Sequence, residues 1–220
     1  MQYKATLTTA NKSKGTNTCQ YIVLHHTGTQ EGTIKGVLNT LTVGSVSCHY
    51  VVDTNGDVYK IGEDKDILWH AGTSAWNGLT DLNKYSIGIE VIGVLKDGGF
   101  TDAQRESVGK LVLEIASKYA IPKENFVRHK DIAPGRKVDI ADTFWNGKFK
   151  TWEDYKTALF AKPAKPMTSK YTEIMNNVLK ETGFQPIFQS HEGDKPLTEQ
   201  ETKELIEISL ARFFARAAKK

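Results

Sequence analysis

The segment that most limits the fold of this chain is the run Cys19–His25, which reads Cys-Gln-Tyr-Ile-Val-Leu-His. It is short, apolar and rich in β-forming residues, as expected of a strand buried inside a sheet. A second run of this kind, Ser86–Gly93, carries Glu90 in its middle. Helical segments alternate with these runs along the chain. This order predicts an α/β layered domain built on a central mixed β-sheet that helices flank.

Local signals place the other elements of this domain. Thr54–Asp57 contains Asn-Gly between two β-forming runs, His49–Asp53 and Val58–Ile61, and so predicts a hairpin. A short helix is expected over Thr33–Leu41 and another over Thr151–Phe160.

The longest predicted helix begins at a capping box. Thr101 has the features of an N-cap, and Gln104 stands three residues later, where its side chain can reach back. Apolar residues follow at helical spacing, and Pro122 ends the pattern. The predicted α/β domain therefore covers residues 1–160.

The composition of the chain changes after residue 160. Residues 161–170 contain a Pro/Ala/Lys tract with no core-forming side chains, which indicates a semi-rigid linker. Residues 171–220 contain two predicted helices, Tyr171–Lys180 and Thr198–Lys219, and form a small C-terminal helical appendage. The last helix is amphipathic and cationic, so it either packs against its neighbour or makes a weak contact with membrane or cell wall.

The overall composition narrows the class of protein. The formal net charge is +3, with 39% hydrophobic and 25% charged residues, which is typical of soluble globular proteins. Lys and Arg are scattered rather than clustered, so nucleic acid is not an expected partner. No segment has the length of a membrane span, the N-terminus has no apolar run typical of a signal peptide, and two cysteines make no disulfide framework. The oligomeric state cannot be derived from these features.

Four short segments carry side chains suited to chemistry. They are His25-His26 after the first strand, Trp69–Gly72 (Trp-His-Ala-Gly), Glu90 in its strand, and His129–Asp139. A strand-end histidine, a distant histidine and an aspartate ten positions further on could supply three ligands to a catalytic zinc ion. The spacing alone matches no compact metal-binding motif.

Taken together and in this order, the four segments resemble the type 2 N-acetylmuramoyl-L-alanine amidases, whose fold is shared with T7-type lysozyme and animal peptidoglycan recognition proteins. The resemblance covers the chain from Cys19 to Trp152. It implies a zinc-dependent hydrolase that cleaves the bond between N-acetylmuramic acid and L-alanine in peptidoglycan.

The resemblance also implies roles for single residues. His25, His129 and Asp139 correspond to the family's zinc ligands. Glu90 and Lys137 correspond to its catalytic carboxylate and to a lysine that stabilises the oxyanion. For His70, in the segment that lines the family's substrate groove, a substrate contact and a packed core histidine remain equally open.

Other polar residues near these segments have simpler interpretations. His26 and His49 are interpreted as structural, and Arg136 as an ordinary loop charge. The chain departs from the family at two positions: Cys48 precedes His49 where some relatives have tyrosine, and Ile140 follows Asp139 where many have proline.

Several functions agree with this resemblance. We expect a phage or prophage endolysin, made without a signal peptide in the cytoplasm of a bacterial host and acting on the wall after release. The alternatives are a cytosolic wall-recycling amidase, a non-catalytic peptidoglycan recognition module, and an assembly protein of a phage particle. The three retained ligand residues argue against the recognition module.

Overall fold

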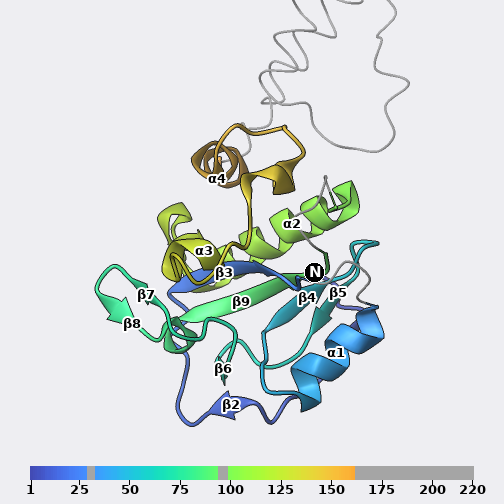
Figure 1. The fold of residues 1–220 in the computed structure, drawn as a ribbon, viewed down its shortest axis with the longest axis vertical. Helices are drawn as coiled ribbons and strands as arrows, with labels where there is room; N and C mark the ends of the chain where they lie inside the picture. Colours follow the sequence, from blue (N-terminus) through green and yellow to red (C-terminus); the bar gives the residue numbers. More distant parts are fainter. Residues whose placement is uncertain (29–32, 94–98, 162–220) are drawn as a thin grey trace, which may run out of the picture. The chain divides into compact units, whose positions relative to one another are not determined.

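The computed structural model describes residues 1–28, 33–93 and 99–161, and residues 1–160 form one compact unit (Figure 1). The linker and the C-terminal helices predicted for residues 161–220 lie outside the described residues, apart from residue 161. No helix in the described part of the chain is long and apolar enough to cross a membrane.

A six-stranded mixed sheet forms the centre of the domain, in the order β1-β5-β4-β9-β3-β10. Its strands are β1 (Ala5–Thr6), β3 (Tyr21–His26), β4 (Tyr50–Val52), β5 (Val58–Lys60), β9 (Ser86–Val91) and β10 (Phe126–Arg128). Only the β4–β5 pair is antiparallel, and its hairpin closes at the predicted Asn-Gly turn, where Gly56 has a φ of 86°. The other neighbours in the sheet are parallel.

Side chains of strand β3 alternate between the faces of the sheet. On β3, Ile22 and Leu24 belong to the apolar cluster that includes helix α2 (Asp102–Tyr119). Tyr21 and Val23 belong to a cluster on the opposite face. Helices α1 (Ile34–Val43) and α2 lie on different sides of the sheet, so apolar residues are buried on both faces (Figure 1).

The helices begin where the sequence predicts. The Thr33 hydroxyl accepts a hydrogen bond from the Gly36 amide at the start of α1. At the start of α2, Thr101 and Gln104 form the complete capping box. Helix α2 ends at Tyr119, ahead of Pro122. The predicted mixed sheet with flanking helices is therefore confirmed.

The remaining elements are short. They are β2 (Lys12–Ser13), β6 (Ile67–Leu68), β7 (Ala75–Trp76), β8 (Leu79–Thr80), α3 (His129–Ile132) and α4 (Trp152–Phe160), with 3₁₀ helices η1 (Leu82–Lys84), η2 (Lys123–Asn125) and η3 (Asp142–Trp145). The sequence analysis missed all of these except α4, because elements of two to four residues carry too little periodicity to detect. It also began the first strand too early, since Cys19 has a φ of 55°, outside the β region.

Candidate metal centre

Strand alternation places His25 and Glu90 side by side. Ile87, Ile89 and Val91 of β9 belong to the cluster around α2, so Glu90 points to the opposite face. On β3 the same alternation directs His25 to that face. The two residues are direct neighbours in the parallel β3–β9 register.

The other two predicted ligands come from the segment after β10. Strand β10 pairs with β3, and His129 begins helix α3 immediately beyond it. The following loop turns back, and the amide of Lys130 donates a hydrogen bond to the carbonyl of Asp139 at 2.6 Å. Ile140, next in the chain, is fully buried in the core and so anchors this end of the loop.

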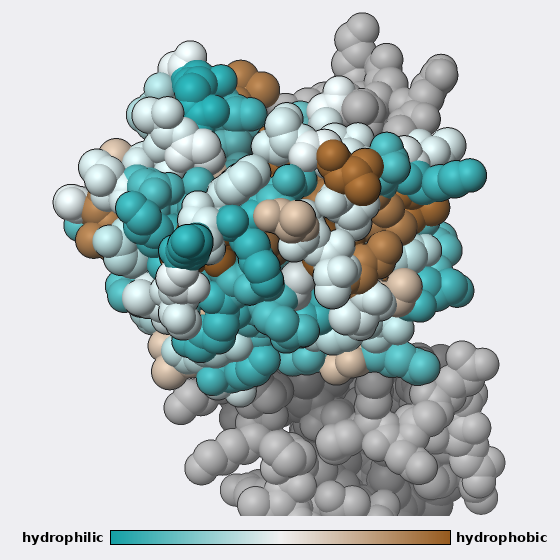
Figure 2. Space-filling model, turned by 90° about the horizontal axis from the view of Figure 1, so that it is seen from below, coloured by the Kyte–Doolittle hydropathy of each residue, from teal (hydrophilic) through white to brown (hydrophobic). Residues whose placement is uncertain are grey.

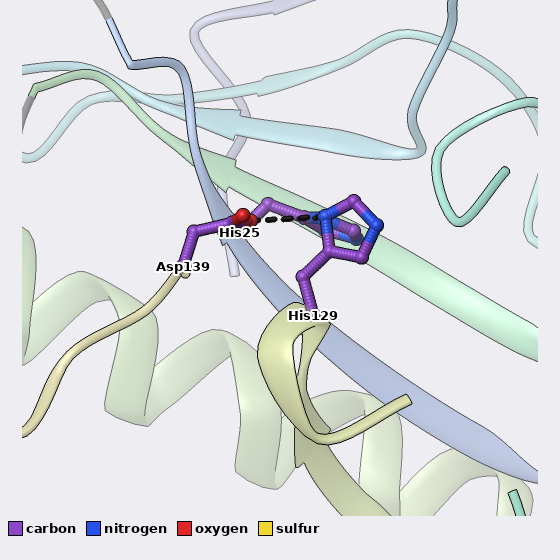
Figure 3. Close-up of side chains that lie close together, drawn as sticks. All are labelled: His25, His129 and Asp139. Carbon is purple, nitrogen blue, oxygen red and sulfur yellow. Dashed lines mark hydrogen bonds and ion pairs between the residues drawn. The ribbon is translucent and has the colours of Figure 1, made fainter. Parts of the chain in front are cut away.

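The side chains of His25, His129 and Asp139 point toward one another (Figure 3). The Nδ1 atoms of the two histidines are 2.8 Å apart. Oδ2 of Asp139 lies 3.0 Å from Nδ1 of His129 and 3.5 Å from Nδ1 of His25. All three side chains are buried, and one ligand atom from each lies within 4.8 Å of the others. The structure thus brings together the three residues that the sequence analysis proposed.

A hydrogen bond to a backbone carbonyl determines which ring nitrogen of His129 carries the proton. Nε2 of this ring lies 3.1 Å from the carbonyl oxygen of Ala71, which can only accept a hydrogen bond. The proton of the neutral ring is therefore on Nε2, and Nδ1 presents a lone pair to Asp139. A lone pair facing a carboxylate is repulsive unless a cation lies between them, so the geometry fits a metal site.

The donor set also indicates the kind of metal. Burial lowers the pKa of His25 to about 4, so this imidazole is neutral at pH 7, as a metal ligand must be. Two imidazole nitrogens and one carboxylate oxygen suit zinc in a catalytic site, which keeps a position open for water.

Glu90 is partly buried beside this cluster. Its Oε2 atom has no hydrogen-bond partner among the described residues. Burial raises the pKa of Glu90 to about 8; the charge of Asp139 adds to this effect, and the charge of Lys137 opposes it. The charge of Lys137 thus acts on Glu90, and the catalytic roles predicted for both residues stay predictions.

The remaining histidines take different positions. His49 is buried and hydrogen-bonded, accepting from the Gly88 amide through Nδ1 and contacting the Asp66 carbonyl through Nε2, as the structural interpretation predicted. His26 binds the Gly28 amide through Nδ1. His70 is only 8% exposed, and its Nδ1 lies 3.0 Å from Nε2 of His25.

Two contributors to the site were missed from the sequence. One is the carbonyl of Ala71, which no side-chain pattern reveals. The other is Arg136, whose Nη2 donates to the carbonyls of Ala71 and Thr73 at 2.8 and 2.7 Å. Arg136 therefore holds the segment that orients His129, and its interpretation as an ordinary loop charge was wrong.

Comparison with known families gives one match over the described domain. The sequence profile of a family described as N-acetylmuramoyl-L-alanine amidase matches residues 15–142. The chain is 37% identical over 138 residues to the N-acetylmuramoyl-L-alanine amidase AmiD of Escherichia coli, covering 56% of this chain and 49% of AmiD. It is 36% identical over 115 residues to the 1,6-anhydro-N-acetylmuramyl-L-alanine amidase AmpD of Haemophilus influenzae, covering 52% and 59% of the two chains. The chain thus spans about half the length of these relatives.

Solved structures share the fold. The complex of E. coli AmiD with anhydro-N-acetylmuramic acid-L-Ala-D-gamma-Glu-L-Lys has a TM-score of 0.55 at 29% identity, covering 91% of this chain and 73% of that one. An AmpD structure has a TM-score of 0.57 at 23% identity, with 72% and 95% covered, and supports the fold alone.

Proposed function

Because the chain belongs to the N-acetylmuramoyl-L-alanine amidase family, we propose that it hydrolyses the amide bond between N-acetylmuramic acid and L-alanine in peptidoglycan. The observation that carries this proposal is the set of three buried ligand atoms beside a carboxyl group with a raised pKa. His25, His129 and Asp139 would hold zinc, which would supply a Lewis acid for the amide carbonyl and would lower the pKa of water.

Glu90 acts as the proton carrier in this proposal. With a pKa of about 8, its carboxyl group exchanges a proton easily near neutral pH. It accepts a proton from the attacking water and returns that proton to the departing nitrogen of L-alanine. Its Oε2 atom, which has no hydrogen-bond partner among the residues that the structure describes, is available for this exchange.

Lys137 stabilises the charge that develops on the amide oxygen. Its ammonium group is close enough to Glu90 and His25 to affect the pKa of each. A fixed positive charge in a buried site stabilises an oxyanion more than it would in water. We therefore assign Lys137 to the transition state rather than to metal binding.

A groove beside Glu90 is suited to the substrate. It has a volume of about 320 Å³ and is lined by Glu90 together with Thr27, Gly36, Val37, Thr40, Leu41 and Val46. Hydrophobic side chains gather on the right of the face shown in Figure 2, the side on which α1 lies in Figure 1. The mainly apolar lining would exclude water around the scissile amide, which strengthens the electrostatic effects of Glu90 and Lys137.

Two biological roles are compatible with this chemistry. The names of the relatives favour the processing of muropeptides that carry 1,6-anhydro-N-acetylmuramic acid. The phage endolysin expected from the sequence would instead act on the intact wall. Rates on soluble anhydromuropeptide and on intact sacculi, measured with the full chain, separate the two roles.

Product analysis tests the activity itself. The full chain is incubated with peptidoglycan, with and without a chelator, and new amino groups and new reducing ends are measured. We expect new N-terminal alanine without reducing ends, lost on chelation and restored by zinc. Reducing ends would mean a glycosidase, and release that resists chelation would exclude a metal-dependent mechanism.

A further inference from the structure

The segment Trp69–Gly72 lies against the metal centre from the side of β9. Oδ1 of Asn83 accepts hydrogen bonds from the amides of His70 and Ala71, at 3.0 and 2.8 Å. This contact fixes the backbone of the segment. Its two central residues then face different ligands: the Ala71 carbonyl contacts His129, and the His70 ring contacts His25.

The partners of His70 determine where its proton lies. Its Nε2 atom is 3.4 Å from both the carbonyl oxygen and the hydroxyl oxygen of Ser86. That hydroxyl already donates to the Leu82 carbonyl at 2.6 Å, so both oxygens face His70 as acceptors. A neutral His70 therefore carries its proton on Nε2 and presents a bare Nδ1 to His25.

The position of the proton on the His25 ring follows from its position on the His70 ring. Because Nδ1 of His70 accepts, the hydrogen bond of 3.0 Å between the rings requires a proton on Nε2 of His25. The Nδ1 atom of His25 is then bare and faces His129 and Asp139. The opposite tautomer would point a proton into the metal site.

The sheet is shaped to admit the His70 ring. A Cβ atom on Gly88 would lie 2.4 Å from Cγ of His70, closer than any real contact. Ser86, Gly88 and Glu90 are alternate residues of β9 and share one face. Ser86 thus supplies acceptors for His70, Gly88 leaves room for its ring, and Glu90 is the proposed proton carrier.

We propose that His70 is a positioning residue: it holds the proton of His25 on Nε2 so that Nδ1 is free to bind the metal, and Gly88 leaves the space that this contact needs. The inference rests on the proposed function for the presence of a metal. It assigns His70 to the support of a ligand and not to a substrate contact. Outer-sphere partners of metal-bound histidines typically change metal affinity by about 10–100-fold.

Asparagine and leucine at position 70 form a matched pair. They have nearly the same shape, but Asn places an acceptor oxygen close to where the Nδ1 atom of histidine lies, and Leu has no acceptor. Affinities for Zn²⁺ and Co²⁺ are measured on the full chain by competition with a chromogenic chelator, after thermal unfolding has shown that each variant is folded. We expect His70→Leu to weaken binding about 10–100-fold and His70→Asn to stay within a few-fold of the parent.

A third variant tests the same contact from the strand. Gly88→Ala keeps every polar group but pushes the His70 ring away, so it should weaken metal binding in the same way as His70→Leu. Equal affinities for His70→Leu and the parent would overturn the proposal, as would equal losses for Leu and Asn. A rise in KM in both variants at unchanged metal affinity would also overturn it and would support a substrate contact.

Nuclear magnetic resonance keeps this test separate from the proposed function. Long-range ¹H–¹⁵N spectra of the metal-free protein report which nitrogen of His25 carries the proton. We expect Nε2 in the parent and a changed distribution in His70→Leu. A parent protein that binds no metal would contradict the proposed function, whereas a proton on Nδ1 of His25 in the parent would contradict this inference alone.

Discussion

Asp64 and Asp139 are both buried carboxylates, with 3% and 6% of their surfaces exposed, but different kinds of atoms surround them. The hydroxyl of Tyr50 donates to one oxygen of Asp64 at 2.5 Å. Lys118 and the hydroxyl of Tyr119 donate to the other oxygen at 2.6 and 2.7 Å. Protein groups thus donate hydrogen bonds to both oxygens of Asp64.

Asp139 lies among atoms that accept. Its Oδ2 atom faces Nδ1 of His129 and Nδ1 of His25, and the outer contacts of these rings place their protons on the far nitrogens. The comparison shows that burial alone does not mark a carboxylate as functional. A buried carboxylate that hydrogen-bond donors surround is a structural group. A buried carboxylate that faces other acceptors forms part of a cation site.

The largest expected effect is that of Asp139→Asn. Loss of one ligand and its charge should lower zinc affinity and amidase activity by about 10³-fold or more, while the fold is kept. Chelator competition and hydrolysis of peptidoglycan measure the two quantities. Retention of parental metal affinity would show that the three facing side chains are not a metal site.

Glu90→Gln should separate chemistry from metal binding. We expect activity to fall by about 10³-fold, because an amide cannot carry the proton, while zinc affinity changes little. Single-turnover hydrolysis by the zinc-loaded variant is the measurement. Parental activity in this variant would remove Glu90 from the mechanism.

Glu90 should also make the stability of the metal-free protein depend on pH. Its pKa in the folded state, raised by burial to about 8, exceeds the usual value of 4.5, so folding favours the protonated form. The stabilisation is complete below about pH 4.5 and is lost as the pH rises through 8, a change on the order of 4 kcal/mol. Urea unfolding between pH 5 and pH 8.5 should show this slope in the parent and a flatter profile in Glu90→Gln.

Asp64→Asn is the matched counterpart of Asp139→Asn. It should lower the stability of the fold and leave metal affinity unchanged, whereas Asp139→Asn should do the reverse. It should cost roughly 2 kcal/mol of unfolding free energy, because buried hydroxyl donors lose their acceptor, while metal affinity stays at the parental level. Burial alone would raise the pKa of Asp64, but hydrogen bonds from Lys118 and the two tyrosines hold it below the usual 3.8.

The stabilisation from Asp64 is therefore present above pH 3.8 and is lost as the pH falls through the lower pKa of the folded state. The stability difference between Asp64→Asn and the parent should shrink in that acid range. Weaker metal binding in Asp64→Asn would mean that the two networks are coupled, and the comparison would fail.

The sequence by itself determined the local parts of this protein. The strands that hold His25 and Glu90, the capping box of Thr101 and Gln104, and the hairpin at Gly56 all appear where predicted. These features depend on contacts between residues close in the chain, so their signals are readable in short windows. The three proposed ligands could be named because their motifs occur together and in the family's order.

Only the tertiary structure decided how these groups are supported. Asp64 lies in the charged run Glu63–Asp66, which nothing in the sequence distinguishes from a solvated loop, yet its donors are up to 55 residues away. The contacts of His70 with His25 and of Ala71 with His129 join segments 45 and 58 residues apart. The direction of each hydrogen bond, and therefore the tautomer of each ligand, depends on atoms that the folded chain brings together from distant segments.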